Sequence, residues 1–318
     1  MTTFSPAVTH AQTYGTLGRS FDYLPDAIEV ELAERFNVID AGLVQLFGDM
    51  AGRGSDTLRV RRVGGLGGAR AMTAMASETE VGSALGFTGG YTTVTIGRYH
   101  TGDTTSQMRE ILQQDGYGIE ALAATYADSL IKSMRASMCT TGATMATAKG
   151  TSGAALDVDD LIGLIAAYEE TEGFDGQVVD VTLHPEQWSD LRNATRSEPS
   201  LQFPDTWKEL QTLRAQFGFK AALSGFNFWT SSDVTTSGGD HVGFSCVRGG
   251  IGYAIGSTDR LQMLNNGNRI VVPGAGLVID YSTDGQRAIE RADGNAYFGT
   301  ALGSSAVYPQ FKVLSVND

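Results

Sequence analysis

The chain has 318 residues and a hydrophobic content of 42%, which is enough for a sizeable core without disulfide or metal support. Its formal net charge of −13 argues against a dedicated nucleic-acid binder, because such a protein needs a basic surface to neutralise phosphates. The two cysteines lie far apart in no known motif, and no apolar run approaches the roughly 18 residues of a membrane span, so neither a disulfide framework nor a membrane-spanning protein is expected.

Residues 1–24 have four aromatic side chains but only two charged ones, and they lack the basic start and the apolar block of a signal peptide. A disordered tail is usually richer in charge and poorer in aromatics, so this composition favours an extended arm that rests on another surface. A frayed terminus is the alternative that composition leaves open. In residues 25–50 the apolar side chains recur at steps of three and four, which predicts a helix that Gly42 could interrupt.

Residues 51–103 contain two alternating segments, TLRVRRV (57–63) and YTTVTIGRY (91–99), on either side of a glycine-rich stretch. This pattern predicts a long two-stranded arm with a flexible tip. Because an isolated two-stranded arm buries too little surface to be stable alone, we expect it to lie on a neighbouring subunit. The arm also has the one basic concentration of an acidic chain: Arg53, Arg59, Arg61, Arg62 and Arg70.

We interpret these arginines as partners for acidic groups of the neighbouring subunit, since arginine is well suited to interface ion pairs. Contact with nucleic acid and a solvated strand face are the two alternatives.

A single apolar stripe along residues 117–142 predicts one long helix of roughly 35 Å. A small, polar linker follows at 144–155, and the rest of the chain has the pattern of a compact α/β unit. Three helices are expected in this unit: one that begins at Asp157, one that begins at Pro185 and one within 205–218. The first of them should place Leu161 and Ile162 inward. The expected strands are 176–183, 226–233, 241–246, 251–256, 277–282, 287–293 and 306–316.

No motif in the sequence predicts chemistry. The four histidines lie in four different sequence contexts without metal-ligand spacing, so we expect neither a metal site nor a cofactor. The segment GFSCV (243–247) resembles a nucleophile elbow but ends in Val247 where a glycine is required. A hydrolase that uses Ser245 or Cys246 is one alternative, but the strand pattern on both sides favours buried residues, and we expect the chain not to be an enzyme.

The order of these parts resembles the major capsid proteins of tailed phages, which have the Hong Kong 97-type fold. The phrases VVDVTLHPEQWSDLRNA (178–194), FNFWTSSDV (226–234), GGIGYAIG (249–256) and AVYPQFKVLSV (306–316) are similar to segments of that family. The resemblance covers essentially the whole chain and implies an α+β fold with an N-arm, an extended E-loop hairpin, a P domain with a long spine helix and a compact A domain.

The resemblance implies the following boundaries: an N-terminal arm at 1–24, a helical segment joining the P domain at 25–52, the E-loop at 53–103, the P domain with its spine helix at 104–150, the A domain at 151–280, and returning P-domain strands at 281–318. Some family members link subunits covalently through an E-loop lysine. Residues 51–103 contain no lysine, so such a link is not expected here.

The implied function is that of a coat protein that assembles as pentamers and hexamers into an icosahedral shell around double-stranded phage DNA. An encapsulin-like nanocompartment with the same fold is the alternative. The implied partners are other copies of the chain, a separate scaffolding protein, a portal and in some relatives a decoration or cement protein, and the implied location is the virion, after assembly in the host cytoplasm. The residues expected at contacts between subunits are Tyr14, Phe21, Tyr23, Arg59, Arg61, Arg62, Arg70 and Arg98.

Overall fold

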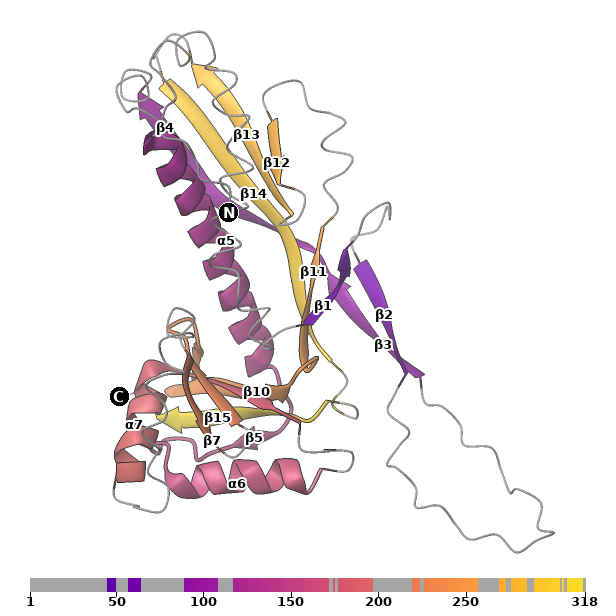
Figure 1. Cartoon of the computed structure of the whole chain (residues 1–318), viewed down its shortest axis with the longest axis vertical. Helices are drawn as coiled ribbons and strands as arrows, with labels where there is room; N and C mark the ends of the chain where they lie inside the picture. Colours follow the sequence, from indigo (N-terminus) through magenta and orange to yellow (C-terminus); the bar gives the residue numbers. More distant parts are fainter. Residues whose placement is uncertain are drawn as a thin grey trace, which may run out of the picture.

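The computed structural model describes residues 45–49, 57–63, 89–107, 117–171, 174, 177–196, 219–223, 226–256, 269–272, 276–284, 289–303, 305 and 308–316. Two sheets and a long helix dominate this part of the chain (Figure 1). None of the described helices is both long enough and apolar enough to cross a membrane.

The first sheet has six strands in the order β1-β11-β14-β13-β12, and β4 pairs with the other edge of β14. The longest strand, β14, pairs antiparallel with β11, β13 and β4, whereas β1 joins β11 in parallel. The strands of this sheet are β1 (Gln45–Asp49), β4 (Gly97–Gln107), β11 (Ile251–Ile255), β12 (Arg269–Val272), β13 (Leu277–Asp284) and β14 (Ile289–Leu302).

The second sheet has seven strands in the order β5-β15-β10-β6-β8-β7, and β9 pairs with β10. It is mixed, because β6 and β8 are parallel while β10 runs antiparallel to both β6 and β15. Its strands are β5 (Ala148–Lys149), β6 (Val179–Leu183), β7 (Phe219–Leu223), β8 (Phe226–Thr230), β9 (Thr235–Ser237), β10 (Asp240–Val247) and β15 (Gln310–Val316).

A third, two-stranded sheet is the antiparallel pair of β2 (Thr57–Val63) and β3 (Gly89–Thr95). The described helices are α5 (Tyr117–Ala143), α6 (Val158–Glu169) and α7 (Pro185–Arg196). In Figure 1, α5 runs along β4 and β14 and ends at the second sheet, and α6 and α7 lie on the side of that sheet away from α5.

The core is built around α5. One continuous cluster of buried apolar residues joins Tyr126, Leu130 and Met134 of α5 to Phe298 of the first sheet and Phe244 of the second. A separate cluster fills the space between the second sheet and the helices α6 and α7. Strand β10 is covered on both faces, since Phe244 and Cys246 belong to the α5 cluster and Val247 to the other.

Most of the predicted elements are confirmed. The alternating segment at 57–63 forms a strand, and the segment at 91–99 is divided between β3 and the start of β4. The long helix spans Tyr117–Ala143, and α6 has the expected N-cap, in which the Asp157 carboxylate accepts a hydrogen bond from the Asp160 backbone N–H. The predicted helix at 205–218 lies outside the described residues, as do residues 1–24 and 25–44.

The end of the predicted 25–50 helix is wrong, because Gln45–Asp49 is a strand. The register of β1 against β11 runs from Gln45↔Gly252 to Asp49↔Ile255. Pairing with a strand two hundred residues away thus prevails over the local helical period of this short segment.

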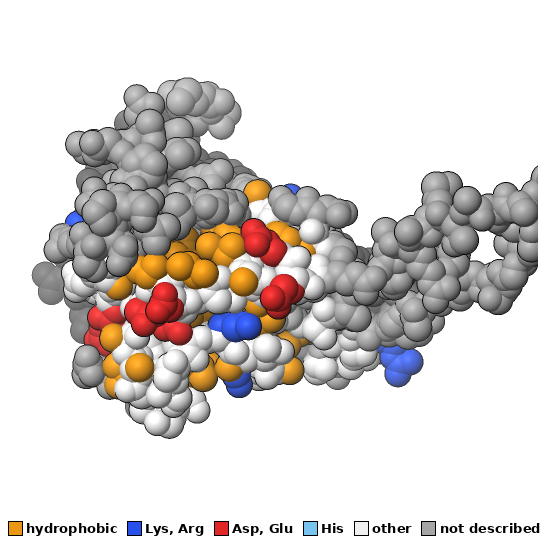
Figure 2. Space-filling model, turned by 90° about the horizontal axis from the view of Figure 1, so that it is seen from below, with side chains coloured by type: hydrophobic (Ala, Val, Ile, Leu, Met, Phe, Trp, Pro, Cys, Tyr) orange, Lys and Arg blue, Asp and Glu red, His pale blue; other side chains and the backbone are white. Residues whose placement is uncertain are grey.

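The inward face predicted for α6 is wrong at Ile162, which is 52% exposed. The buried side chains of α6 are Leu161, Leu164, Ala167 and Tyr168. Figure 2 shows the molecule from the side on which α6 lies, and hydrophobic side chains there lie among acidic ones. The apolar stripe of α6 is therefore wider than its contact with the sheet.

The later strands are divided between the two sheets differently from the division that the sequence predicts. Strands β11, β12 and the first residues of β13 were expected in the compact α/β unit, yet they belong to the sheet that lies along α5. Conversely, β15 was expected to return to that sheet, but it pairs with β10 and β5 in the other one. Besides the connection through α5, the chain passes between the sheets after β10 and again after β14.

The two passages touch each other at glycines. The Gly303 backbone N–H donates to the Gly250 carbonyl over 2.7 Å, and a Cβ on Gly303 would collide with the Gly249 carbonyl oxygen. Gly249 itself has a φ of +93°, a region that side chains other than glycine rarely adopt. Gly249, Gly250 and Gly303 thus let the two passages lie against each other.

Two helical glycines give a matched test of the α5 packing. At Gly142 a Cβ would lie 2.5 Å from Cγ of Phe244, whereas at Gly163 in α6 it would meet nothing within 4 Å. We expect Gly142→Ala to destabilise the fold by about 1–3 kcal/mol through overpacking. Gly163→Ala should instead stabilise it by about 0.5–1 kcal/mol through helix propensity. Denaturant unfolding measures both, and equal effects at the two sites would contradict the proposed contact.

Candidate functional site

The hairpin β2–β3 is the described part of the predicted arm, and its two faces differ sharply. Leu58 is paired with Val94 across the ladder, and both are buried, with exposures of 4% and 0%. Their neighbours Arg59 and Thr93 form the next pair and are exposed. The alternation that the sequence predicts for this segment is therefore confirmed at these positions.

The buried face of the hairpin rests on the chain's own first sheet. Leu58 and Val94 form a small cluster with Ala254 of β11, and Ile96 and Ala301 pack against it. At Gly299 of β14 a Cβ would collide with the Thr95 carbonyl, so only glycine permits this approach of β3. Figure 1 shows the hairpin at the margin of the molecule, on the other side of the first sheet from α5.

This contact corrects the prediction for the arm. We expected residues 51–103 to rest on a neighbouring subunit, yet the described base of the hairpin packs on its own molecule. Residues 97–103, at the end of the predicted arm, belong to β4, which pairs with β14. Residues 64–88, between the two strands of the hairpin, lie outside the described part.

The structure places only some of the predicted contact residues. Arg59 is exposed on the outer face of β2, and the backbones of Arg61 and Arg62 pair with Tyr91 and Gly90. Arg98 is exposed on β4, where its Nε donates to Oδ1 of Asn295 over 2.8 Å. Tyr14, Phe21, Tyr23 and Arg70 lie outside the described residues.

Neither suggested nucleophile can meet a substrate in this structure. Ser245 is fully buried, accepts a hydrogen bond from the Tyr168 hydroxyl over 3.0 Å and donates to the Phe311 carbonyl. Cys246 is also fully buried, and burial raises the pKa of its thiol to about 12. Both side chains therefore serve the packing of β10.

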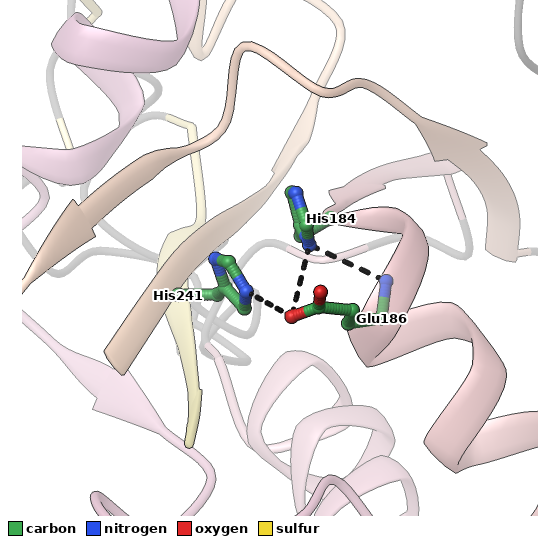
Figure 3. A group of neighbouring side chains, drawn as sticks. All are labelled: His184, Glu186 and His241. Atoms are coloured by element: carbon green, nitrogen blue, oxygen red, sulfur yellow. Dashed lines mark hydrogen bonds and ion pairs between the residues drawn. The ribbon is translucent and has the colours of Figure 1, made fainter. Parts of the chain in front are cut away.

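Three side chains that could hold a metal ion meet beside the start of α7 (Figure 3). They are His184, Glu186 and His241, and their ligand atoms all lie within 4.8 Å of one another. The two imidazole rings are stacked at 3.7 Å between centroids, and Nε2 of His241 lies 2.6 Å from Oε2 of Glu186. The hydrogen bond with His241 lowers the pKa of the Glu186 carboxyl, and burial followed by the neighbouring His241 ring lowers that of His184.

Sequence reasoning missed this cluster, because it judged each histidine by its local spacing. His241 is more than fifty positions from the other two residues and reaches them only because β10 pairs with β6, which ends directly before His184. A ladder pairing of this kind leaves no short-range signal in the sequence.

No protein-family model matches the sequence. No curated protein sequence matches it either. Solved structures do match. The chain is similar to the capsid of Ralstonia phage GP4, with 9% identity, 86% of each chain covered and a TM-score of 0.53. It is also similar to the mature capsid of bacteriophage PhiM1, with 9% identity, 86% of each chain covered and a TM-score of 0.52. A structure of Mycobacterium phage Che8 matches with 13% identity, 86% of this chain and 89% of that chain covered, and a TM-score of 0.51.

The chain has the fold of a phage capsid protein. At such low identity the likeness concerns the fold, and it confirms at that level the resemblance to major capsid proteins that the order of segments predicted. The helices and strands agree with the predicted α+β class.

The hairpin contact can be tested with two neighbouring residues of β3. Val94→Asp places a charge in a fully buried position and should destabilise the fold by at least about 3 kcal/mol, or release the hairpin from the sheet. Thr93→Asp introduces the same side chain on the exposed face and should be nearly neutral. Amide hydrogen exchange along β2 and β3 measures the release, and equal exchange in both variants would argue against the buried contact.

The two cysteines provide a second test. Burial raises the pKa of both Cys139 and Cys246 to about 12, so hardly any thiolate is present at neutral pH. We expect neither thiol to react with iodoacetamide in the folded protein and both to react after denaturation. Rapid labelling of Cys246 in the folded chain, located by mass spectrometry, would reopen its role as a nucleophile.

Proposed function

We propose that the chain is the major coat subunit of a tailed phage and assembles as pentamers and hexamers into an icosahedral shell around double-stranded DNA. The observation that carries this proposal is the likeness to phage capsid structures, which covers 86% of this chain and 86% of each of the two capsid chains. The acidic net charge of −13 fits a container wall, since such a wall repels DNA and lets it be packed and released.

We assign α5 and the first sheet to the P domain, the second sheet with α6 and α7 to the A domain, and the hairpin β2–β3 to the base of the E-loop. The P domain then includes β11 to β13, and the A domain includes β15. In this assignment the exposed face of the hairpin, with Arg59, is available to a neighbouring subunit.

Shell assembly multiplies weak contacts. Each subunit in a closed shell touches several others, so modest pairwise interactions give a stable particle. Ion pairs at the outer face of the hairpin would contribute to such contacts and would be screened by salt. A scaffolding protein, a portal and a decoration protein are further proposed partners, and the virion is the proposed location.

The direct test is electron microscopy of the purified full-length protein. We expect closed, regular particles, and co-expression with the neighbouring phage genes should give particles that hold nuclease-protected DNA. Particles that always enclose a protein cargo in place of DNA would favour the nanocompartment. A chain that stays monomeric at high concentration, with and without a scaffolding protein, would contradict the proposal.

Arg59 offers a test of the assembly contact that leaves the fold intact, because its side chain is exposed. We expect particle stability to fall in the order wild type, Arg59→Lys, Arg59→Ala, Arg59→Glu, since the charge is kept, removed and then reversed. The differences should shrink at high salt. Particle yield measured by sedimentation gives this order, and circular dichroism checks that each variant is folded. Identical yields for all four proteins would show that Arg59 does not contribute to the assembly contact.

A further inference from the structure

We propose that His184, Glu186 and His241 form a binding site for a divalent transition-metal ion of the Zn²⁺ class. This proposal is independent of the shell function, because all three residues belong to one chain. It rests on the ligand set, on the distances between the ligand atoms and on the way the backbone holds the two histidines.

The ligand set selects the class of ion. Two imidazole nitrogens and one carboxylate suit Zn²⁺, Co²⁺, Ni²⁺ and Cu²⁺, whereas Mg²⁺ and Ca²⁺ prefer oxygen ligands alone. Three protein ligands leave a fourth tetrahedral position for water, and Glu186, whose side chain is 50% exposed, is open to solvent. The Glu186 carboxylate also offsets the partial positive charge at the start of α7.

The distances from the Glu186 carboxylate to the two histidines are close to those around a bound ion. Zinc binds nitrogen and oxygen ligands at about 2.0–2.2 Å, so its tetrahedral ligands lie about 3.3–3.5 Å apart. Oε2 of Glu186 lies 2.6 Å from Nε2 of His241 and 3.7 Å from Nδ1 of His184, which brackets this value. For an ion to bind, the exposed Glu186 side chain has to move, and Nδ1 of His184 has to give up the hydrogen bond that it accepts from the Glu186 backbone N–H over 3.3 Å. The ion would then replace the hydrogen that joins His241 to the carboxylate.

One buried side chain fixes the two histidines relative to each other. Gln187 is fully buried, and its Oε1 accepts a hydrogen bond from the His184 backbone N–H over 2.9 Å. Its Nε2 donates to the His241 carbonyl over 3.1 Å and to the Val313 carbonyl over 3.2 Å. The same amide therefore fixes the two ligand-bearing backbones relative to each other. The imidazole rings are stacked with an angle of 17° between their planes, so one ring has to rotate for both nitrogens to face a common ion.

The other ring nitrogen of His241 has a partner as well. Nδ1 of His241 lies 3.4 Å from the Thr236 hydroxyl in β9, which pairs with β10. Metal-binding histidines commonly place their second nitrogen against a polar group that fixes the ring orientation. A bound ion would thus tie the start of α7 to the paired strands β9 and β10.

The test is a Zn²⁺ titration of the chelator-treated full-length protein by calorimetry, followed by thermal unfolding. We expect one ion per chain and a higher unfolding temperature with Zn²⁺, because a ligand that binds only the folded state stabilises it. Mg²⁺ should have no such effect. Co²⁺ in place of Zn²⁺ should give the visible absorption of a tetrahedral site.

The variants separate a metal site from a purely structural hydrogen bond. His184→Gln, His241→Gln and Glu186→Gln should each weaken Zn²⁺ binding at least about tenfold. Of these variants, Glu186→Gln is the one expected to leave the fold intact, since that side chain is half exposed. His100→Gln is the control, because His100 pairs with Asp293 in the other sheet and should not affect binding. A wild-type chain that binds no Zn²⁺, or a Glu186→Gln chain that binds as tightly as wild type, would overturn the proposal.

Discussion

The contact of α5 with both sheets is the constraint on which the rest of the structure depends. Its side chains enter one continuous buried cluster that contains Phe298 from the first sheet and Phe244 from the second. Hydrogen bonds add to the apolar contact, since the hydroxyls of Ser137 and Thr141 each lie 2.7 Å from that of Thr300 in β14. The two sheets therefore cannot shift independently without opening a packed core, which would leave voids and unpaired hydroxyls.

The sequence predicts the elements much better than their partners. The period of α5, the N-cap of α6 at Asp157 and the strand at β10 are predicted from local patterns, and each element is present in the structure. The alternation within β10 does not predict its burial, because all eight of its residues are buried. Which sheet a strand joins is a non-local property. The pattern of AVYPQFKVLSV is compatible with either sheet, and only the pairing of β15 with β10 decides between them. The strand at Gln45–Asp49 was missed for the same reason.

The same distinction applies to the candidate sites. Alternation along TLRVRRV correctly places Leu58 inward and Arg59 outward, because neighbouring residues of a strand face opposite sides. It does not reveal that the inward face has Ala254 of its own chain beneath it, nor that Gly299 makes room for the Thr95 carbonyl. The cluster of His184 and His241 is a product of strand pairing and is equally invisible to spacing rules.

The two hydrogen-bonded passages show how the hairpin β2–β3 and the second sheet are connected through the first sheet. The chain leaves β10 through Gly249 and Gly250 and leaves β14 through Gly303, and these two passages are hydrogen-bonded to each other. Strand β11 begins at the passage that follows β10, and near its other end Ala254 packs against Leu58 of the hairpin. Both ends of β11 are thereby fixed. The hairpin base is thus connected to the second sheet through β11 and β14. In the proposed shell, this continuity would let contacts made by the arm of one subunit hold its whole body in place.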